Sequence, residues 1–266
     1  MNVEELLKTN GSEKPLDVIV TDGGLCSIFR TIGCIGDSLA SGEFEGTDES
    51  GGKTYNDFFE YSWGQYIARA AGCRVHNFSR GGMTAKEFTE SFGDKKGCWN
   101  SENACQAYII ALGVNDIYNL KMETGSVADI DLSNYQNNRE TFAGYYGKIV
   151  QRIKSITPDA KLFFMTMPRE SFEQEKLAAG DSHAELLREM AKLFSNSYVI
   201  DLRKYAPVYD EEFKRNYYLG GHMQPCGYVV TAYMVMSYID WIIRHNIGDF
   251  KQVGFIGTPH KNTVAQ

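Results

Sequence analysis

Proline is scarce in this sequence, and no stretch of it resembles a linker between domains. Only six of the 266 residues are proline, and no proline- or serine-rich run or block of like charge is long enough to join two domains. Hydrophobic residues make up 43% and charged residues 23%, which excludes the disordered and fibrous classes. We therefore predict one domain over residues 1–266 with a sizeable core, in which residues 1–29 form an N-terminal extension whose structure the sequence does not define.

Paired cysteines and an export signal are also missing. The six cysteines form no CxxC pair and show no metal-ligand spacing. The N-terminal residues, MNVEELLKTNGSEKPLD, lack the basic and then apolar pattern of a signal peptide. Because disulfides persist mainly in oxidising compartments, we predict reduced thiols in a cytoplasmic protein that contains no metal site.

Positive charge is in deficit, because the formal net charge is −7 at pH 7. Binding to nucleic acid or to an anionic membrane surface requires concentrated Lys and Arg. The longest nearly apolar stretch, residues 228–243, contains Thr231, Ser237 and Asp240 and is short for a membrane span, so we predict a mostly buried helix there. Neither nucleic acid nor a membrane is expected as a partner, and the sequence carries no signature of the oligomeric state.

Short apolar runs alternate with longer segments of helical period, a pattern typical of a parallel sheet covered by helices on both faces. The apolar runs predict strands at 30–35, 74–78, 107–112, 161–166 and 197–201. Helical spacing predicts helices within 55–72, 135–158, 182–194 and 227–246. The polar segment 41–57 is predicted to be a long loop that borders the ligand cleft.

Four polar or glycine-rich clusters lie at the ends of these predicted elements. They are GDSL at 36–39, NFSRGGMT at 77–84, GVND at 113–116 and GGHMQPCGY at 220–228. In an open doubly wound sheet the ligand crevice lies beyond the carboxyl ends of the strands, where the strand order reverses. With the flavodoxin-like order 2-1-3-4-5, the loops after the first and third strands flank this point, so we expect Ser38 and Asn115 to lie close together.

These clusters resemble the four sequence blocks of the SGNH, or GDSL-type, esterase and acylhydrolase family. Ser38, Gly82, Asn115 and His222 match the Ser, Gly, Asn and His of those blocks, and the similarity extends from about residue 30 to residue 246. The resemblance implies an α/β fold, a three-layer α/β/α sandwich around a doubly wound, mostly parallel five-stranded sheet. It also implies hydrolysis through an acyl-enzyme without a cofactor or metal, with Ser38 as nucleophile and His222 as base. The backbone N–H groups of Ser38 and Gly82 and the side-chain amide of Asn115 would form the oxyanion hole.

The residue types suit this chemistry. A serine hydroxyl is a weak nucleophile until an imidazole takes its proton, and the oxyanion that follows needs fixed donors in a site largely free of water. Each residue also has an ordinary structural interpretation: Ser38 as a helix cap, Gly82 as a positive-φ turn residue, Asn115 as part of an Asx turn and His222 as a surface residue. Their combination favours the catalytic interpretation.

One position departs from the family pattern. The family usually has Asp three residues before the His, where this sequence has Leu219, and no carboxylate lies between Glu212 and His222. We consider three explanations. A backbone carbonyl near Leu219 or Gly220 accepts from Nδ1 of His222 and forms a dyad, a more distant acid such as Asp201 or Asp210 reaches the imidazole, or the protein is catalytically impaired. Because a carbonyl stabilises the imidazolium less than a carboxylate does, the dyad predicts a lower peak rate and not inactivity.

The predicted function is that of a serine esterase acting on small acyl esters, with O-acetyl groups on carbohydrates among the candidate substrates. Lipid acyl esters and thioesters suit the same machinery. A rival interpretation is a ligand-binding pseudoenzyme of the same fold. A flavodoxin-like nucleotide or flavin binder is a second rival, but it needs a phosphate-cradling loop after the first strand, where GDSLASG has an acid.

Overall fold

A five-stranded parallel sheet forms the centre of the computed structural model, which describes residues 3–7, 9–170 and 174–263. Its strands are β1 (Thr31–Gly36), β4 (Arg74–Ser79), β5 (Ala107–Ala111), β6 (Lys161–Met165) and β7 (Ser197–Ile200). They lie in the order β4-β1-β5-β6-β7, and every neighbouring pair is parallel. The five predicted strands and the 2-1-3-4-5 order are therefore confirmed, with strand ends shifted by one residue at most.

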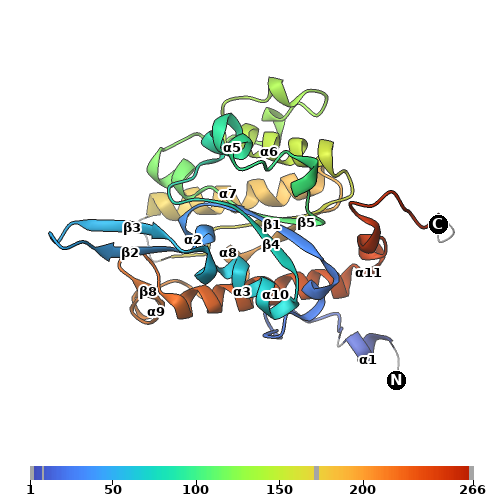
Figure 1. Ribbon diagram of the computed structural model, residues 1–266, viewed down its shortest axis with the longest axis horizontal. Coiled ribbons are helices and arrows are strands. Elements are labelled where there is room, and N and C mark those ends of the chain that lie inside the picture. The colour runs from blue at the N-terminus through green and yellow to red at the C-terminus, as the bar shows by residue number, and fades with distance from the viewer. Residues whose placement is uncertain (1–2, 8, 171–173, 264–266) are drawn as a thin grey trace.

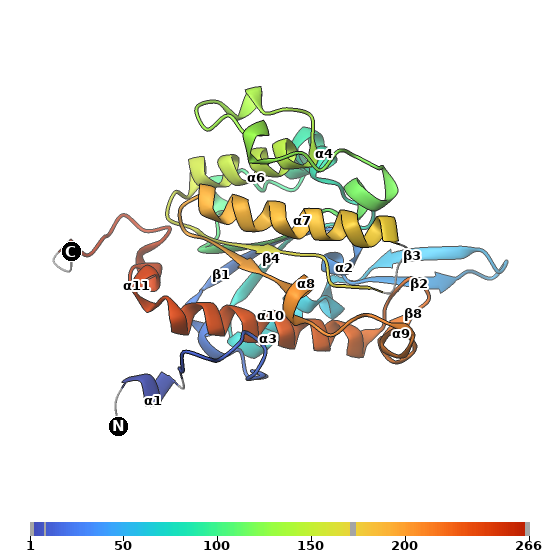
Figure 2. The ribbon, with the colours of Figure 1, turned by 180° about the vertical axis from the view of Figure 1, so that it is seen from behind.

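Helices cover both faces of this sheet and complete the predicted three layers. The helices α3 (Trp63–Ala71) and α10 (Pro225–His245) lie on one face, and α6 (Phe142–Ile156) and α7 (Gln174–Leu193) lie on the other (Figures 1 and 2). Side chains alternate between the two resulting cores, as a pleated strand requires. On β1, Ile32 and Cys34 pack with the α3 and α10 side, whereas Ile35 packs with the α6 and α7 side.

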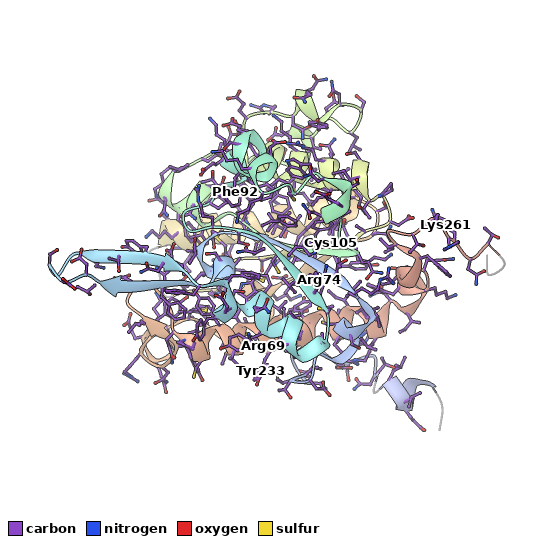
Figure 3. The ribbon with its side chains drawn as sticks, viewed as in Figure 1. Arg69, Arg74, Phe92, Cys105, Tyr233 and Lys261 are labelled. Carbon is purple, nitrogen blue, oxygen red and sulfur yellow. The ribbon has the colours of Figure 1, made fainter. Side chains whose placement is uncertain are left out.

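Each core is filled largely by side chains with no exposed surface. Trp63, Ile67 and Tyr228 belong to the first core, and Phe142, Tyr146 and Leu187 belong to the second. Phe92 and Cys105, which Figure 3 labels, also belong to the second core. The predicted helix at 227–246 is confirmed as α10, which is long and apolar enough to cross a membrane by length and composition but is mostly buried inside the fold.

Local sequence signals explain where these helices begin and end. The hydroxyls of Ser62 and Thr141 accept hydrogen bonds from the backbone N–H groups of Gln65 and Gly144 and so cap α3 and α6. Gly72 ends α3 at a φ of 66°, which favours glycine. The helix predicted within 55–72 begins only at Trp63, so its first part was predicted wrongly.

The segment expected to be a polar loop at 41–57 contains a β-hairpin instead, so the expectation of a loop was wrong. Its expected position beside the ligand cleft is confirmed, because Glu43 and Tyr55 line that cleft. Strand β2 (Glu43–Thr47) pairs antiparallel with β3 (Lys53–Asp57), and the hairpin projects beyond the sheet (Figure 1). The ring of Phe44 packs against Phe58, Tyr61 and Tyr228, which anchors the hairpin to the body of the protein. Because side chains alternate along a strand, Glu43 and Glu45 share the face opposite Phe44.

The N-terminal extension packs along α10. It contains α1 (Val3–Leu7) and a 3₁₀ turn at Gly24–Ile28. The guanidinium of Arg244 in α10 pairs with Glu13 at 2.6 Å and with Asp240 at 2.7 Å. The other short α-helices and strands of the described residues are α2 (Ser38–Ser41), α4 (Ala85–Glu87), α5 (Gly93–Lys95), α8 (Leu202–Tyr205), α9 (Glu211–Tyr217), β8 (Tyr218–Leu219), β9 (His222–Met223) and α11 (Ile247–Phe250).

Candidate active site

Ser38 stands where β1 ends and the one-turn helix α2 begins. Asp37, and not Ser38, is the cap of this helix, because its Oδ1 accepts a hydrogen bond from the N–H of Leu39 at 3.1 Å. Within the described residues, the Ser38 hydroxyl makes no hydrogen bond. It does not cap the helix and is available to a substrate. Burial raises the pKa of the Asp37 carboxyl to about 7.

A cleft of about 690 Å³ lies at the carboxyl edge of the sheet and brings the four predicted blocks together. Ser38, Gly82, Asn115 and His222 all line it, although they are scattered over 185 positions between residues 38 and 222. They arrive from the ends of β1, β4 and β5 and from β9. This is the edge where a parallel sheet with reversing strand order has its ligand crevice.

Two of these residues offer hydrogen-bond donors to the cleft. Gly82 has a φ of 72°, as its turn interpretation predicted, and its N–H donates to no acceptor within the described part of the chain. The Asn115 side chain donates from Nδ2 to the carbonyl oxygen of Met83 at 3.0 Å and accepts at Oδ1 from Asn119 at 2.8 Å. One N–H of the Asn115 amide therefore holds the Gly82 loop, and the second remains for a ligand.

Asp116 has a structural role beside the cleft. Its buried carboxylate accepts a hydrogen bond from the N–H of Ala85 at 2.9 Å, which ties the GVND block to the segment after Gly82. Burial raises the pKa of this carboxyl to about 6.

His183, which the sequence analysis did not single out, contacts the backbone that leads into the GVND block. Its Nε2 lies 3.1 Å from the carbonyl oxygen of Leu112, and complete burial lowers the pKa of the imidazole to about 4. Gly113 has a φ of 136°, and a Cβ there would lie 2.6 Å from the His183 ring nitrogen. The backbone at Leu112 and Gly113, which leads to Asn115, therefore packs against the neutral imidazole of His183.

His222 lies between two carboxylates of strand β2. Its Nε2 is 2.9 Å from Oε1 of Glu43, and its Nδ1 is 4.0 Å from Oε2 of Glu45. Glu43 lines the cleft, whereas Glu45 does not. Burial lowers the pKa of the imidazole, and the negative charges of Glu45 and Asp57 oppose this shift. Burial also raises the pKa of the Glu43 carboxyl, with a smaller contribution from Asp57.

The acids expected to orient His222 are engaged elsewhere, so this part of the prediction is corrected. Asp201 accepts hydrogen bonds from Arg188 and caps α8, and Asp210 caps α9 through the N–H of Phe213. The alternative of a backbone carbonyl near Leu219 or Gly220 is not seen either, because Nδ1 of His222 has no hydrogen-bond partner among the described residues. The carboxylates beside the imidazole come from the hairpin instead.

Sequence reasoning missed Glu43 and Glu45 because it treated their segment as a loop. The available signal was the pattern Glu-Phe-Glu at 43–45, which places two acids on one face of a strand and an aromatic residue on the other. Within the described residues, no cluster of three or more His, Cys, Asp or Glu side chains is arranged to hold a metal ion.

The fold is that of an α/β/α protein, and its cleft at the carboxyl edge of the sheet brings together a serine, a histidine and an asparagine. The model of the GDSL-like lipase/acylhydrolase family matches residues 34–230, which is more than half of the chain, and the protein belongs to that family. It is accordingly a carboxylic ester hydrolase of the GDSL type. No curated protein sequence matches this chain.

Solved structures with the same fold include two carbohydrate esterases and a possible lipase. A possible lipase from Chitinophaga pinensis is 17% identical, with a TM-score of 0.54, 82% of this chain covered and 98% of that one. A family two carbohydrate esterase from Clostridium thermocellum, in complex with cellohexaose, is 14% identical, with a TM-score of 0.53 and coverages of 83% and 65%. A family 3 carbohydrate esterase from the same organism is 15% identical, with a TM-score of 0.51 and coverages of 81% and 97%. At these identities the likeness establishes the fold.

Proposed function

We propose that this esterase hydrolyses short acyl esters, among them O-acetyl groups on carbohydrates, through an acyl-enzyme formed on Ser38. The observation that carries the proposal is the convergence of Ser38, Gly82, Asn115 and His222 on one cleft. A hydroxyl, an imidazole and fixed N–H donors around one space are the components that acyl transfer requires.

In the proposed reaction, Nε2 of His222 takes the proton of Ser38 while Oγ bonds to the acyl carbon. The N–H groups of Ser38 and Gly82 and the free N–H of the Asn115 amide stabilise the oxyanion. The imidazolium then gives its proton to the leaving alkoxide, and a water molecule, activated by the same imidazole, releases the acid. Because Nε2 lies beside Glu43 in the structure, the imidazole has to exchange this contact for Ser38 when substrate binds.

A small apolar recess beside the cleft supports a short acyl group. It has a volume of about 40 Å³, and it shares Asp37, Leu39, Val114, Met167 and Pro168 with the cleft. The indole of Trp63, which has no exposed surface, belongs to its lining. A recess of this size has room for the tail of a short acyl chain but not for a long one, which favours acetyl-like groups over lipid acyl chains.

Polar groups along the rest of the cleft support a carbohydrate as the alcohol part. Glu170 and Lys214 form an ion pair at 2.9 Å in the cleft wall, and Asn119 lies nearby on the same lining. Tyr55, which is 55% exposed, stands at the hairpin side with its ring 5.7 Å from that of His222. An exposed aromatic ring beside several hydrogen-bonding groups suits a sugar, and the structural similarity to carbohydrate esterases agrees with this proposal.

The test compares the wild type with Ser38→Ala and His222→Ala in two assays. One measures hydrolysis of p-nitrophenyl acetate, butyrate and octanoate, and the other measures acetate release from acetylated xylan and acetylated cello-oligosaccharides. We expect activity on acetate and on at least one acetylated saccharide, with losses of at least about 10³-fold in both variants. A silent wild type would favour the ligand-binding pseudoenzyme. Full activity in Ser38→Ala would exclude the acyl-enzyme.

A further inference from the structure

The residue that orients His222 is not supplied by the segment that precedes the histidine. Position 219 holds Leu219, whose side chain is 55% exposed and which pairs with His222 across the short β8–β9 ladder. Nδ1 of His222 has no hydrogen-bond partner among the residues that the structure describes. The carboxylate oxygen Oε2 of Glu45 lies 4.0 Å from Nδ1.

Glu45 is held in place by contacts to both the hairpin and the histidine loop. Its Oε1 pairs with Lys53 of the facing strand at 2.5 Å, and its Oε2 accepts a hydrogen bond from the N–H of Gly221 at 2.8 Å. Although Lys53 is 68% exposed, only 12% of the Glu45 side chain is exposed. Because the lysine pair and the Gly221 hydrogen bond favour the charged form, the pKa of Glu45 lies below its usual range.

The two glycines before His222 make room for this carboxylate. A Cβ at Gly220 would lie 2.7 Å from Cδ of Glu45, and a Cβ at Gly221 would lie 3.1 Å from its Oε2. Gly220 also has a φ of 71°. The sequence Leu-Gly-Gly-His at 219–222 contains no acid. Because Gly220 and Gly221 have no side chains, the Glu45 carboxylate from strand β2 can approach the His222 imidazole.

The two hairpin glutamates lie beside different nitrogens of the imidazole. Glu43 lines the cleft together with Ser38 and lies beside Nε2, the nitrogen that must serve the nucleophile. Glu45 does not line the cleft, and its Oε2 lies beside Nδ1. The other groups near the ring on β3 are the Tyr55 ring and the Asp57 carboxylate, which binds the hydroxyl of Ser41 and the N–H of Gly81.

We propose that Glu45 is the positioning carboxylate of His222, supplied by strand β2 in place of an acid three residues before the histidine. This inference rests on the proposed function. Its role is to accept a hydrogen bond from the Nδ1–H group when the ring turns from Glu43 towards Ser38, and to stabilise the imidazolium that forms when Ser38 is deprotonated. Glu43 is then the resting partner of Nε2 and not the orienting acid.

The test breaks the Lys53–Glu45 ion pair in two ways, by substituting either Glu45 or Lys53. Glu45→Gln deletes a negative charge near the imidazole, so the pKa of His222 should fall, whereas Lys53→Met deletes a positive charge and the pKa should rise. Opposite shifts show that the Glu45 charge acts on the imidazole, and the accompanying loss of kcat distinguishes a positioning role from a merely structural one. Glu49→Gln, which removes an exposed carboxylate in the turn of the same hairpin, is the matched control and should leave the pKa unchanged.

The pKa of His222 is measured by NMR titration of the free protein, which needs no turnover, and by the acid limb of the kcat/KM profile on p-nitrophenyl acetate. We expect Glu45→Gln to lower kcat by roughly 10²–10⁴-fold with little change in KM. An unchanged or raised His222 pKa in Glu45→Gln, or shifts of the same sign in Glu45→Gln and Lys53→Met, would overturn the proposal.

The two proposals fail in different ways. If Glu45→Gln does not fold, Lys53→Met keeps Glu45 and decides the question through the direction of its shift. If the wild type hydrolyses no ester, the proposed function fails while the NMR titration still tests the placement of Glu45. Loss of turnover in Glu43→Gln together with an unchanged His222 pKa in Glu45→Gln would assign the role to Glu43 instead.

Discussion

The side-chain amide of Asn115 donates a hydrogen bond to the carbonyl oxygen of Met83 at 3.0 Å, and this bond joins the loops that follow β5 and β4. The same amide is the proposed side-chain donor of the oxyanion hole. Its position is therefore set by the loop that carries the second donor, the N–H of Gly82. The two donors are held as one unit.

Asn115→Ala removes one proposed oxyanion donor and the bond to Met83. We expect kcat on p-nitrophenyl acetate to fall by roughly 10²–10³-fold, because a transition-state contact is lost, while KM changes little. Steady-state kinetics measure the split between the two constants. Asn119→Ala removes the hydrogen bond to Oδ1 of Asn115 and a polar group proposed to face the sugar, but it leaves the Asn115 amide in place. It is the matched control on p-nitrophenyl acetate, which has no sugar, and an equal loss there would contradict the assignment.

Gly113→Ala places a Cβ 2.6 Å from the ring nitrogen of His183, at a φ of 136° that disfavours any side chain. We expect the free energy of unfolding to fall by roughly 2 kcal/mol or more, since overpacking and backbone strain act together. Urea denaturation measures the change. Gly248→Ala, where no atom lies within 4 Å of the added Cβ, should change stability far less, and a similar cost at both glycines would argue against the contact with His183.

Met167→Ala enlarges the recess beside the cleft, because Met167 lines both spaces. We expect the ratio of kcat/KM for butyrate over acetate to rise several-fold, since each additional buried CH₂ contributes about 0.8 kcal/mol. The p-nitrophenyl ester series measures this ratio. An unchanged chain-length profile, with activity retained, would place the acyl group elsewhere in the cleft.

Because the Asp37 carboxyl is buried, we expect the free energy of unfolding to fall as the pH rises. Its pKa is about 7 in the folded protein, whereas an ordinary solvent-exposed aspartate has a pKa of 3.8, so between these values the folded state binds a proton that the unfolded state has released. The free energy of unfolding should therefore fall between about pH 4 and pH 7 and level off above that range.

Asp37→Asn tests this assignment, because asparagine keeps an acceptor for capping α2 but does not titrate. Chemical denaturation at pH 5 and pH 8 should show a smaller decrease for the variant than for the wild type. An identical decrease in both proteins would show that Asp37 is not the group responsible.

The sequence by itself determined the sheet and the four blocks of the site. Each strand is a short apolar run with a clear end, such as Thr31–Gly36. Ser38 and Asn115 lie two and four residues after the ends of β1 and β5. Parallel strands bring their carboxyl ends to one edge whatever the intervening chain does, so local patterns were enough to place Ser38, Gly82 and Asn115 along one cleft.

Only the tertiary structure decided what surrounds the imidazole. The segment 43–57 is polar and weakly periodic in sequence. It forms a hairpin that is held against the body of the protein because the Phe44 ring packs against Phe58, Tyr61 and Tyr228. That anchoring turns Glu45 towards His222, 177 positions further along the chain. Contacts of this range depend on how separate elements pack, and no local propensity records them.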